Sequence, residues 1–372
     1  MKNIVQSFEY WKKCYDSDKL EEFNFNSSGL LWLKIKSILR KELIGDFLNK
    51  NQISLIAKKL NEQFVELYDL LKSNLELSHN IIDNFIRAKD KERAQELNTA
   101  ELVSELYKLR YFDWGGDYKN ALDRYLVDRY VKVYKKYDEL VSRFDNEIKN
   151  AVQGYILCSW YNHWSSILIE YIFKSHPIVL PTVGQIKKVD FFVNNIPFDL
   201  KVTYLPANYV EAQRKRKGLK PELTELKQKA KQAQIHFSNH SKADDIYYEI
   251  VEKTKNKGDN FCIDSLNKIK EVRLDILKEA RKNSKLLVQN LYEEQGEMRF
   301  NASNRLFLVL VDTEDFDNSW KMKRNLDLLT PSIMSYLDDF SNKDIEDLKV
   351  YFYYKNRNEK YSAIGDIIFV IR

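Results

Sequence analysis

The sequence predicts an α+β protein: an all-helical N-terminal domain, followed by an α/β core with a central mixed β-sheet. Residues 1–150 contain no proline, and their apolar positions recur three and four residues apart, which is the spacing of amphipathic helices. After Pro177 the pattern changes to short runs that alternate in polarity or are continuously apolar. Such runs are typical of β-strands.

The 372 residues are enough for two domains, each with its own core. We expect a helical domain of five or six helices at 1–150 and an α/β domain at 151–372. Periodic segments occur at 51–72, 91–110 and 119–149, with a break at Gly115-Gly116, and one apolar stripe is marked by Leu30, Leu33, Ile38 and Leu48. Oligomerisation, sensing of a partner and DNA contact all remain open as roles for the helical domain.

The α/β domain is expected to begin with a helix and a β-hairpin. Residues 151–174 place a set of apolar residues on one helical face, namely Ile156, Trp160, Trp164, Ile167 and Tyr171. Two strand-like runs meet at Asn194-Asn195, a pair that tolerates the positive φ angles of a tight turn. We therefore predict an antiparallel hairpin over 186–204. Further strands are predicted at 305–312, 350–354 and 366–372.

Composition and charge exclude several classes of protein. No apolar run approaches the roughly 18 residues of a membrane span, and charged residues interrupt every apolar stretch near the N-terminus. We therefore expect no membrane association and a cytoplasmic location. The cysteines, Cys14, Cys158 and Cys262, are odd in number and far apart, which fits neither a disulfide framework nor a zinc site.

The hairpin carries the residues with the clearest chemistry. Asp199 and Lys201 lie two positions apart on its second strand, so their side chains project from the same face. Asp190 lies on the first strand, and the turn can bring it to the same place. Two carboxylates can hold Mg²⁺, which stabilises the charge that develops on a scissile phosphate, and an ammonium can position the attacking water.

Other acidic-x-Lys triplets occur in the chain, so the spacing alone is not specific. Glu147-Ile148-Lys149 and Glu225-Leu226-Lys227 lie in helical patterns, and Asp347-Leu348-Lys349 lacks a partner carboxylate on a preceding strand. The alternative for Asp199 and Lys201 is a surface ion pair worth under about 1 kcal/mol. The apolar residues that surround them favour a functional site, because charges in such a setting need compensation.

These residues resemble the restriction-endonuclease-like nuclease superfamily, whose signature is written PD-(D/E)xK. Here it reads Val189-Asp190 and Asp199-Leu200-Lys201, with Val189 in place of the proline. The resemblance covers about 160–312. It implies that Asp190 and Asp199 bind Mg²⁺, for which Mn²⁺ can substitute, and that Lys201 assists the attacking water. It also implies a catalytic role for Glu170, because many members carry a glutamate on the helix before the first core strand.

Basic residues near the hairpin are candidates for contacts with a polyanion. Residues 201–240 hold nine Lys or Arg against three Glu, whereas residues 1–150 are balanced at 26 against 25. Local positive charge attracts phosphates. The predicted nucleic-acid-binding residues are Lys187, Lys188, Arg214, Lys215, Arg216 and Lys217.

The functional prediction that follows is a Mg²⁺-dependent endonuclease that cleaves DNA, of the restriction or phage-defence kind, and that forms a homo-oligomer, a dimer in the simplest case. Two alternatives stay open. The same chemistry could act on RNA or await an activating signal, or the fold could serve as a nucleic-acid-binding module without catalysis. His163 is a further candidate ligand or base on the helix that carries Glu170, with a structural, hydrogen-bonded histidine as the competing interpretation.

Overall fold

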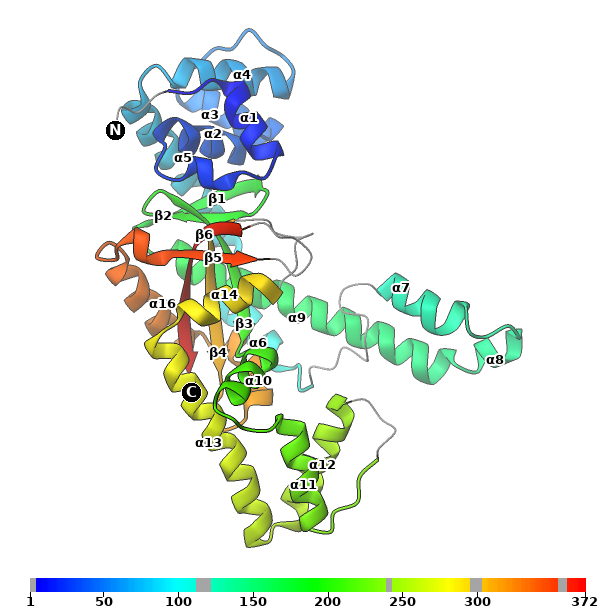
Figure 1. Ribbon diagram of the computed structural model, residues 1–372. Coiled ribbons are helices and arrows are strands. Elements are labelled where there is room, and N and C mark those ends of the chain that lie inside the picture. Colours follow the sequence, from blue (N-terminus) through cyan, green and yellow to red (C-terminus); the bar gives the residue numbers. More distant parts are fainter. Residues whose placement is uncertain (1–4, 112–121, 239–242, 295–302, 354–359) are drawn as a thin grey trace.

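The computed structural model describes residues 5–111, 122–238, 243–294, 303–353 and 360–372. It confirms an α+β fold, with a helical N-terminal region and a six-stranded mixed sheet (Figure 1). The predicted break at Gly115-Gly116 lies outside the described residues. Among the described helices, none is long and apolar enough to span a membrane.

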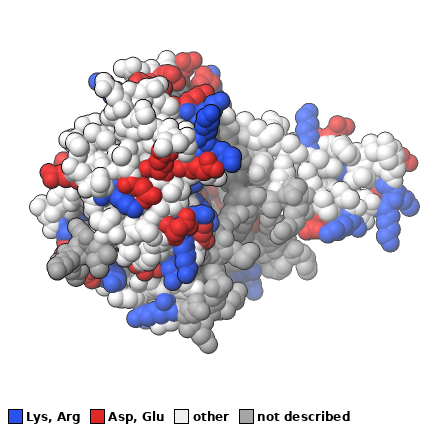
Figure 2. All heavy atoms as spheres, turned by 90° about the horizontal axis from the view of Figure 1, so that it is seen from above, with Lys and Arg blue, Asp and Glu red and all other residues white. Residues whose placement is uncertain are grey.

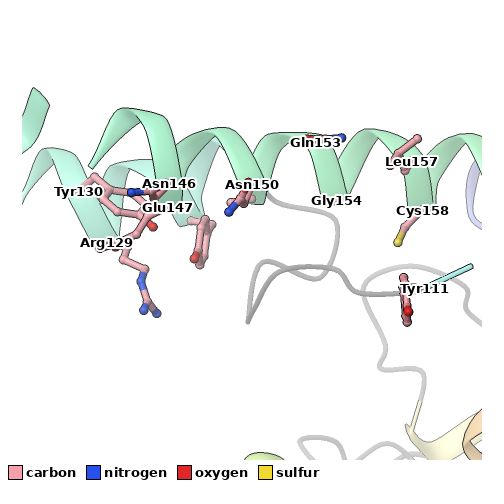
Figure 3. Close-up of a pocket in the computed structure, with 12 residues that line it drawn as sticks. Tyr111, Arg129, Tyr130, Asn146, Glu147, Asn150, Gln153, Gly154, Leu157 and Cys158 are labelled. Atoms are coloured by element: carbon pink, nitrogen blue, oxygen red, sulfur yellow. The ribbon is translucent and has the colours of Figure 1, made fainter. Parts of the chain in front are cut away.

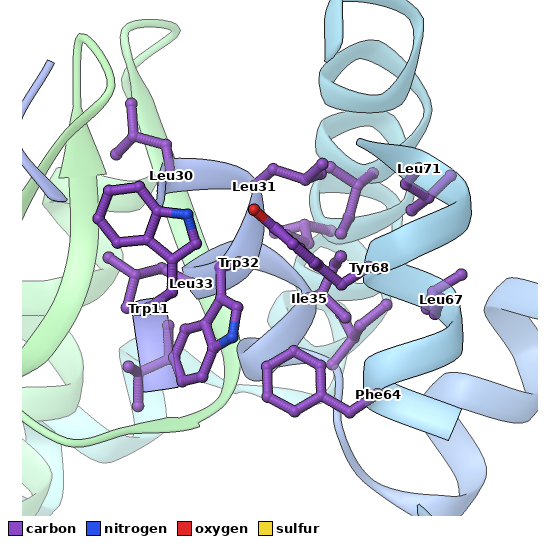
Figure 4. Packing of buried hydrophobic residues seen from close by; sticks show 14 of the residues in the cluster. Trp11, Leu30, Leu31, Trp32, Leu33, Ile35, Phe64, Leu67, Tyr68 and Leu71 are labelled. Atoms are coloured by element: carbon purple, nitrogen blue, oxygen red, sulfur yellow. The ribbon is translucent and has the colours of Figure 1, made fainter. Parts of the chain in front are cut away.

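The N-terminal helices pack around one aromatic-rich core. They are α1 (Phe8–Asp16), the short 3₁₀ helix η1 (Leu20–Phe23), α2 (Ser27–Ser37), α3 (Lys41–Lys50), α4 (Leu60–Leu71) and α5 (Leu75–Glu96). Helix α2 is the central helix, because nearly all of its side chains are buried. Figure 4 shows Trp32 of this helix packed among the buried side chains of Trp11, Phe64 and Tyr68.

The core of these helices continues onto the sheet. Leu180, Val183, Val189 and Phe192 of the first two strands belong to the same buried cluster as the residues of α1–α5. Gly184 lies so close to α2 that a Cβ atom there would be 2.0 Å from the carbonyl oxygen of Ser37. This packing joins residues on both sides of the domain boundary predicted at residue 150. The division into two domains there remains a prediction.

A second group of helices leads from α5 to the sheet. It consists of α6 (Thr99–Tyr107), α7 (Leu122–Leu126), the π-helical turn η2 (Val127–Val131), α8 (Tyr137–Val141), the π-helical turn η3 (Phe144–Ile148) and α9 (Lys149–Lys174). Helices α7 and α8 and the first half of α9 project from the body as an arm (Figure 1). The second half of α9 packs on the sheet through Ile169, Ile172 and Phe173.

The sheet has the order β1-β2-β3-β4-β6-β5. Its strands are β1 (Val179–Ile186), β2 (Val189–Val193), β3 (Ile196–Tyr204), β4 (Arg305–Val311), β5 (Lys349–Tyr353) and β6 (Lys360–Ile371). Strands β1, β2 and β3 form an antiparallel meander, β3, β4 and β6 are parallel, and β5 is antiparallel to β6. The predicted hairpin is confirmed, with Asn194 and Asn195 at φ values of 46° and 62° in its turn.

Helices cover both faces of the parallel strands. After β3 come α10 (Ala207–Arg216), α11 (Glu222–Gln232), α12 (Ala243–Lys257), α13 (Asn260–Lys282) and α14 (Lys285–Glu294). Of these, α10, α13 and α14 pack against one face of the sheet. After β4 come the 3₁₀ helix η4 (Phe316–Arg324), α16 (Leu326–Phe340) and the 3₁₀ helix η5 (Ile345–Leu348), and α16 packs with α9 on the opposite face.

Two expectations about helices are corrected. Residues 53–59 are not helical, and α4 begins only at Leu60, where the apolar repeat of its buried face starts. On α9, the predicted apolar face is not the buried one, since Ile156 is 57% exposed and Tyr171 is 39% exposed. The buried face lies beside it, on Tyr161, Ser165, Leu168 and Ile172.

Candidate functional site

The hairpin brings Asp190 and Asp199 to the same face of the sheet. Phe191 opposes Phe198 and Phe192 opposes Pro197 in the antiparallel register of β2 and β3. One further step in that register sets Asp190 opposite Asp199, and residues that oppose one another project from the same face. Phe191 and Phe198 project from the other face and fill the core there.

Lys201 completes the convergence that the sequence predicts. Its Nζ atom donates a hydrogen bond to Oδ1 of Asp199 at 2.6 Å. Across the strands, Oδ2 of Asp190 accepts the backbone N–H of Leu200 at 2.7 Å. The three side chains therefore gather around one point on β2 and β3.

Arg305 is a member of this site that sequence reasoning missed. It begins β4, and the parallel register pairs it with Asp199. Its fully buried Nε atom lies 3.5 Å from Oδ2 of Asp199, and its guanidinium stacks over the Tyr292 ring at 4.9 Å. The only signal in the sequence was a charged residue at the start of a continuously apolar strand.

Burial affects both aspartates of the site. Burial, and then the nearby Asp199 carboxylate, raise the pKa of Asp190 to about 6. Asp199 is almost fully buried, and its Oδ2 accepts no hydrogen bond within the described part of the chain. A buried carboxylate oxygen without a hydrogen-bond donor is costly unless a cation compensates it. Arg305 compensates part of that charge.

Glu170 lies on α9, the helix that immediately precedes β1, as predicted. It is ion-paired with Lys174 at 2.8 Å. Its charge contributes to the raised pKa of Asp190, which places it near the hairpin site. The same pair faces Asp90 of α5, whose pKa is raised by burial and lowered by Lys174.

The residues present are compatible with a divalent cation. Carboxylate oxygens are the ligands that Mg²⁺ prefers, usually one or two of them with water and substrate completing the shell. Asp190 and Asp199 supply such oxygens, including Oδ2 of Asp199, which accepts no hydrogen bond from any described residue. In the described ranges, no group of three or more His, Cys, Asp or Glu side chains is placed to hold a metal ion, so an ion here would depend on these two carboxylates.

The predicted nucleic-acid-binding residues fall into two classes. Arg214 is fully buried and ion-paired with Glu225, and Lys188 is nearly buried beside Asp18 at 2.6 Å. Both hold the fold together, which corrects their prediction as phosphate contacts. Lys217 is paired with Glu279 and Lys187 with Asp18, at 2.5 and 3.1 Å. Lys215 and Arg216 are exposed at the end of α10.

The remaining candidates lie elsewhere. His163 is exposed on α9, where its ring contacts Trp164. The triplets at Glu147 and Glu225 begin in helical segments, as predicted. Seen from the side of the N-terminal helices, the surface shows acidic and basic side chains interspersed, without a large patch of one sign (Figure 2). This agrees with the balanced charge of residues 1–150.

A cavity of about 530 Å³ lies on the arm, away from the hairpin. Figure 3 shows Arg129 and Tyr130 of η2 facing it together with Asn150 and Cys158 of α9.

Comparison of the chain with protein-family models, curated proteins and solved structures gives no match. The functional conclusion therefore depends on the chemistry of the hairpin site.

Proposed function

We propose that this chain is a divalent-metal-dependent nuclease whose reaction takes place at Asp190, Asp199 and Lys201. The observation that carries the proposal is the meeting of two carboxylates and an ammonium on one face of the hairpin. One carboxylate oxygen there, Oδ2 of Asp199, is buried and accepts no hydrogen bond from the residues that the structure describes.

Each side chain has a separate task in this proposal. Asp190 and Asp199 would hold Mg²⁺ or Mn²⁺, which stabilises negative charge on the scissile phosphate when bound. Lys201 is fixed by its hydrogen bond to Asp199. It orients the attacking water and helps to deprotonate it. Arg305 holds the Asp199 carboxylate in place through the 3.5 Å ion pair between Nε and Oδ2. Glu170 acts through Lys174 and Asp190, as a positioning residue.

DNA is the proposed substrate, and a restriction or phage-defence role is the proposed context. Both come from the resemblance of Asp190 and the Asp199-Leu200-Lys201 triplet to restriction-endonuclease-like nucleases, as does assembly into a homo-oligomer. RNA is the alternative substrate. A binding module without catalysis is disfavoured because all three signature side chains are present, with Lys201 hydrogen-bonded to Asp199 and Asp190 to the backbone of Leu200 between them.

The decisive experiment compares the hairpin with a matched triplet elsewhere. Asp199→Asn and Lys201→Ala should each lower cleavage of plasmid DNA or RNA by about 100-fold or more while substrate binding is retained. Asp347→Asn is the control, because it makes the same change in the exposed triplet Asp347-Leu348-Lys349. Mg²⁺, Mn²⁺ and chelator are tested for each protein.

Two outcomes would contradict the proposal. Wild-type protein that cuts neither nucleic acid with either metal would favour the binding module. Cleavage that survives in both hairpin variants but is lost in Asp347→Asn would move the reaction to the other triplet. Circular dichroism of every variant separates loss of activity from loss of fold.

Phosphate contact is proposed for the exposed pair Lys215 and Arg216. Neutralising both to Gln should weaken nucleic-acid binding and flatten its dependence on salt, because each phosphate contact releases counterions. Lys227→Gln and Lys229→Gln together, on the next helix, remove equal charge as a control. An unchanged salt slope in the first variant would exclude α10 from the interface.

A further inference from the structure

The chain leaves the adjacent parallel strands β3 and β4 toward opposite faces of the sheet. Helix α10 follows β3 onto the face that bears Phe307 and Val309. Segment η4 follows β4 toward α16, on the face that bears Leu306 and Leu308. Connections that diverge in this way leave a crevice outside the carboxyl ends of the strands, where open α/β sheets bind ligands.

A cavity of about 750 Å³ occupies this position. Its walls come from the end of β3, the start of α10, and η4, and it is covered by residues of α11, α12 and α13. The volume lies within the range of small-molecule sites, which is about 300–1,000 Å³. Asp190, Asp199 and Lys201 do not line this cavity, so it is separate from the hairpin site.

One wall of the cavity is a rigid polar cluster. The buried Glu222 carboxylate accepts two hydrogen bonds from Arg273, at 2.6 and 3.0 Å, and a third from the Tyr247 hydroxyl at 2.8 Å. The Arg273 guanidinium also stacks over the Tyr247 and Phe316 rings, at 5.7 and 5.2 Å. A polar cluster whose partners are already paired fixes the shape of the wall.

Two further polar groups line the cavity. The Tyr204 hydroxyl is buried and makes no hydrogen bond within the described part of the chain. The Asp317 carboxylate, at the start of η4, is exposed to solvent, and its charge interacts with that of Arg273. Tyr248 and Trp320 add aromatic surface beside them. A buried hydroxyl without a hydrogen bond and an accessible carboxylate, next to aromatic rings, are features that orient a planar polar ligand.

The charge of the lining narrows the class of ligand. Glu211, Glu222 and Asp317 carry three negative charges against one positive charge on Arg273, which leaves a net charge of two negative. A phosphate would be repelled, whereas amino groups that donate to a carboxylate would be favoured.

We propose that this cavity binds an uncharged nucleoside whose base carries an exocyclic amine. The base would lie against Tyr248 and Trp320, its amine would donate to Asp317, and a ring or ribose oxygen would pair with the Tyr204 hydroxyl. Ligands of this size bind with Kd on the order of 0.1–1 mM when they reach ordinary ligand efficiency.

Isothermal titration calorimetry of the full chain with adenosine and inosine tests the class directly. These nucleosides differ in the exocyclic group, an amine in adenosine and a carbonyl in inosine. Adenosine should bind at least about ten-fold more tightly than inosine, and AMP should bind more weakly than adenosine. Absence of saturable adenosine binding overturns the proposal, as does AMP binding as tightly as adenosine.

Variants locate the ligand. Asp317→Asn and Tyr248→Ala should each weaken adenosine binding by about ten-fold. Glu314→Gln, an exposed change on the same segment, and Tyr137→Ala, a tyrosine that is 79% exposed on the arm, should leave it unchanged. Adenosine affinity that is unaltered by Asp317→Asn and by Tyr248→Ala would place the ligand elsewhere and overturn the assignment.

Discussion

The Asp190 carboxylate joins the two strands of the hairpin, because it accepts the backbone N–H of Leu200 at 2.7 Å. Leu200 is the residue between Asp199 and Lys201, so this hydrogen bond fixes the strand segment that carries both. The same carboxylate is buried beside Asp199, and its pKa is raised to about 6. Asp190 therefore orders the site at an electrostatic cost.

The raised pKa of Asp190 predicts how stability depends on pH. The unfolded value is about 3.9, so the folded state binds more protons between about pH 4 and pH 6. The stabilising contribution of protonated Asp190 is fully present below pH 4 and is lost as pH rises through about 6. At pH 7.5 its ionised form is destabilising.

Asp190→Asn should accordingly raise the free energy of unfolding of the metal-free protein at about pH 7.5, by about 1–3 kcal/mol. The gain should vanish near pH 4. Urea denaturation at the two pH values measures it, with the exposed Asp347→Asn as control. A variant that is less stable than wild type at both pH values would show that the hydrogen bond to Leu200 outweighs the buried charge.

The same group predicts the pH dependence of the proposed reaction. A protonated carboxyl cannot serve as a metal ligand, so cleavage should fall as pH decreases through about 6. The fall should be about ten-fold per pH unit well below that value if one proton is responsible. Activity measured from pH 5 to 8 at limiting and at saturating Mg²⁺ should show the transition moving to lower pH at saturating metal. If the midpoint pH of this transition is the same at both metal concentrations, competition between proton and metal for Asp190 is excluded.

A buried lysine anchors the tip of the hairpin to the N-terminal helices. Lys34 of α2 is fully buried, and its Nζ atom contacts Asp83 of α5 at 2.8 Å, the His79 ring at 3.0 Å and Asn195 of the turn at 3.1 Å. Lys34→Met should lower the free energy of unfolding by about 2–4 kcal/mol, because the Asp83 carboxylate and the Asn195 side-chain amide lose their contact with the ammonium. Lys50→Met, exposed on α3, is the control.

The double variant Lys34→Met with Asp83→Leu separates the possible causes. It should recover part of the lost stability, because it removes the unpaired carboxylate. Amide hydrogen exchange at Asn194 and Asn195 should quicken in the single variant. Unchanged exchange in the turn would show that Lys34 stabilises only α2 and α5.

Local sequence signals predicted the hairpin well because its determinants are local. Asn194-Asn195 tolerates the turn geometry, and the apolar residues on either side fix the register that sets Asp190 opposite Asp199. Arg305 could not be placed in this way. It is more than 100 residues from Asp199 in the sequence, and only the pairing of β3 with β4 makes them neighbours.

Exposure was the other quantity that local patterns could not supply. The run from Arg214 to Lys217 looks uniform as a sequence, yet Arg214 turns inward to Glu225 while Lys215 and Arg216 face solvent. Helical periodicity identified α9 but not its buried side, because aromatic residues occupy more than one face. Which face is covered depends on how the sheet and α6 pack against α9, and the pattern within the helix does not contain this information.

Close packing between α2 and β1 supplies the last prediction. A Cβ atom at Gly184 would lie 2.0 Å from the Ser37 carbonyl oxygen, and backbone cannot yield as a side-chain end can. Gly184→Ala should therefore destabilise the protein by about 3 kcal/mol or more, by forcing the N-terminal helices from the hairpin. Gly45→Ala is the matched control. Gly45 lies within α3, and no atom is within 4 Å of a Cβ built there. Alanine at this position should therefore stabilise the protein by about 0.5–1 kcal/mol.

Thermal denaturation of both variants gives the comparison, and limited proteolysis shows which region opens first. If Gly184→Ala melts with wild-type midpoint, the helices and the hairpin are not packed as tightly as this contact requires.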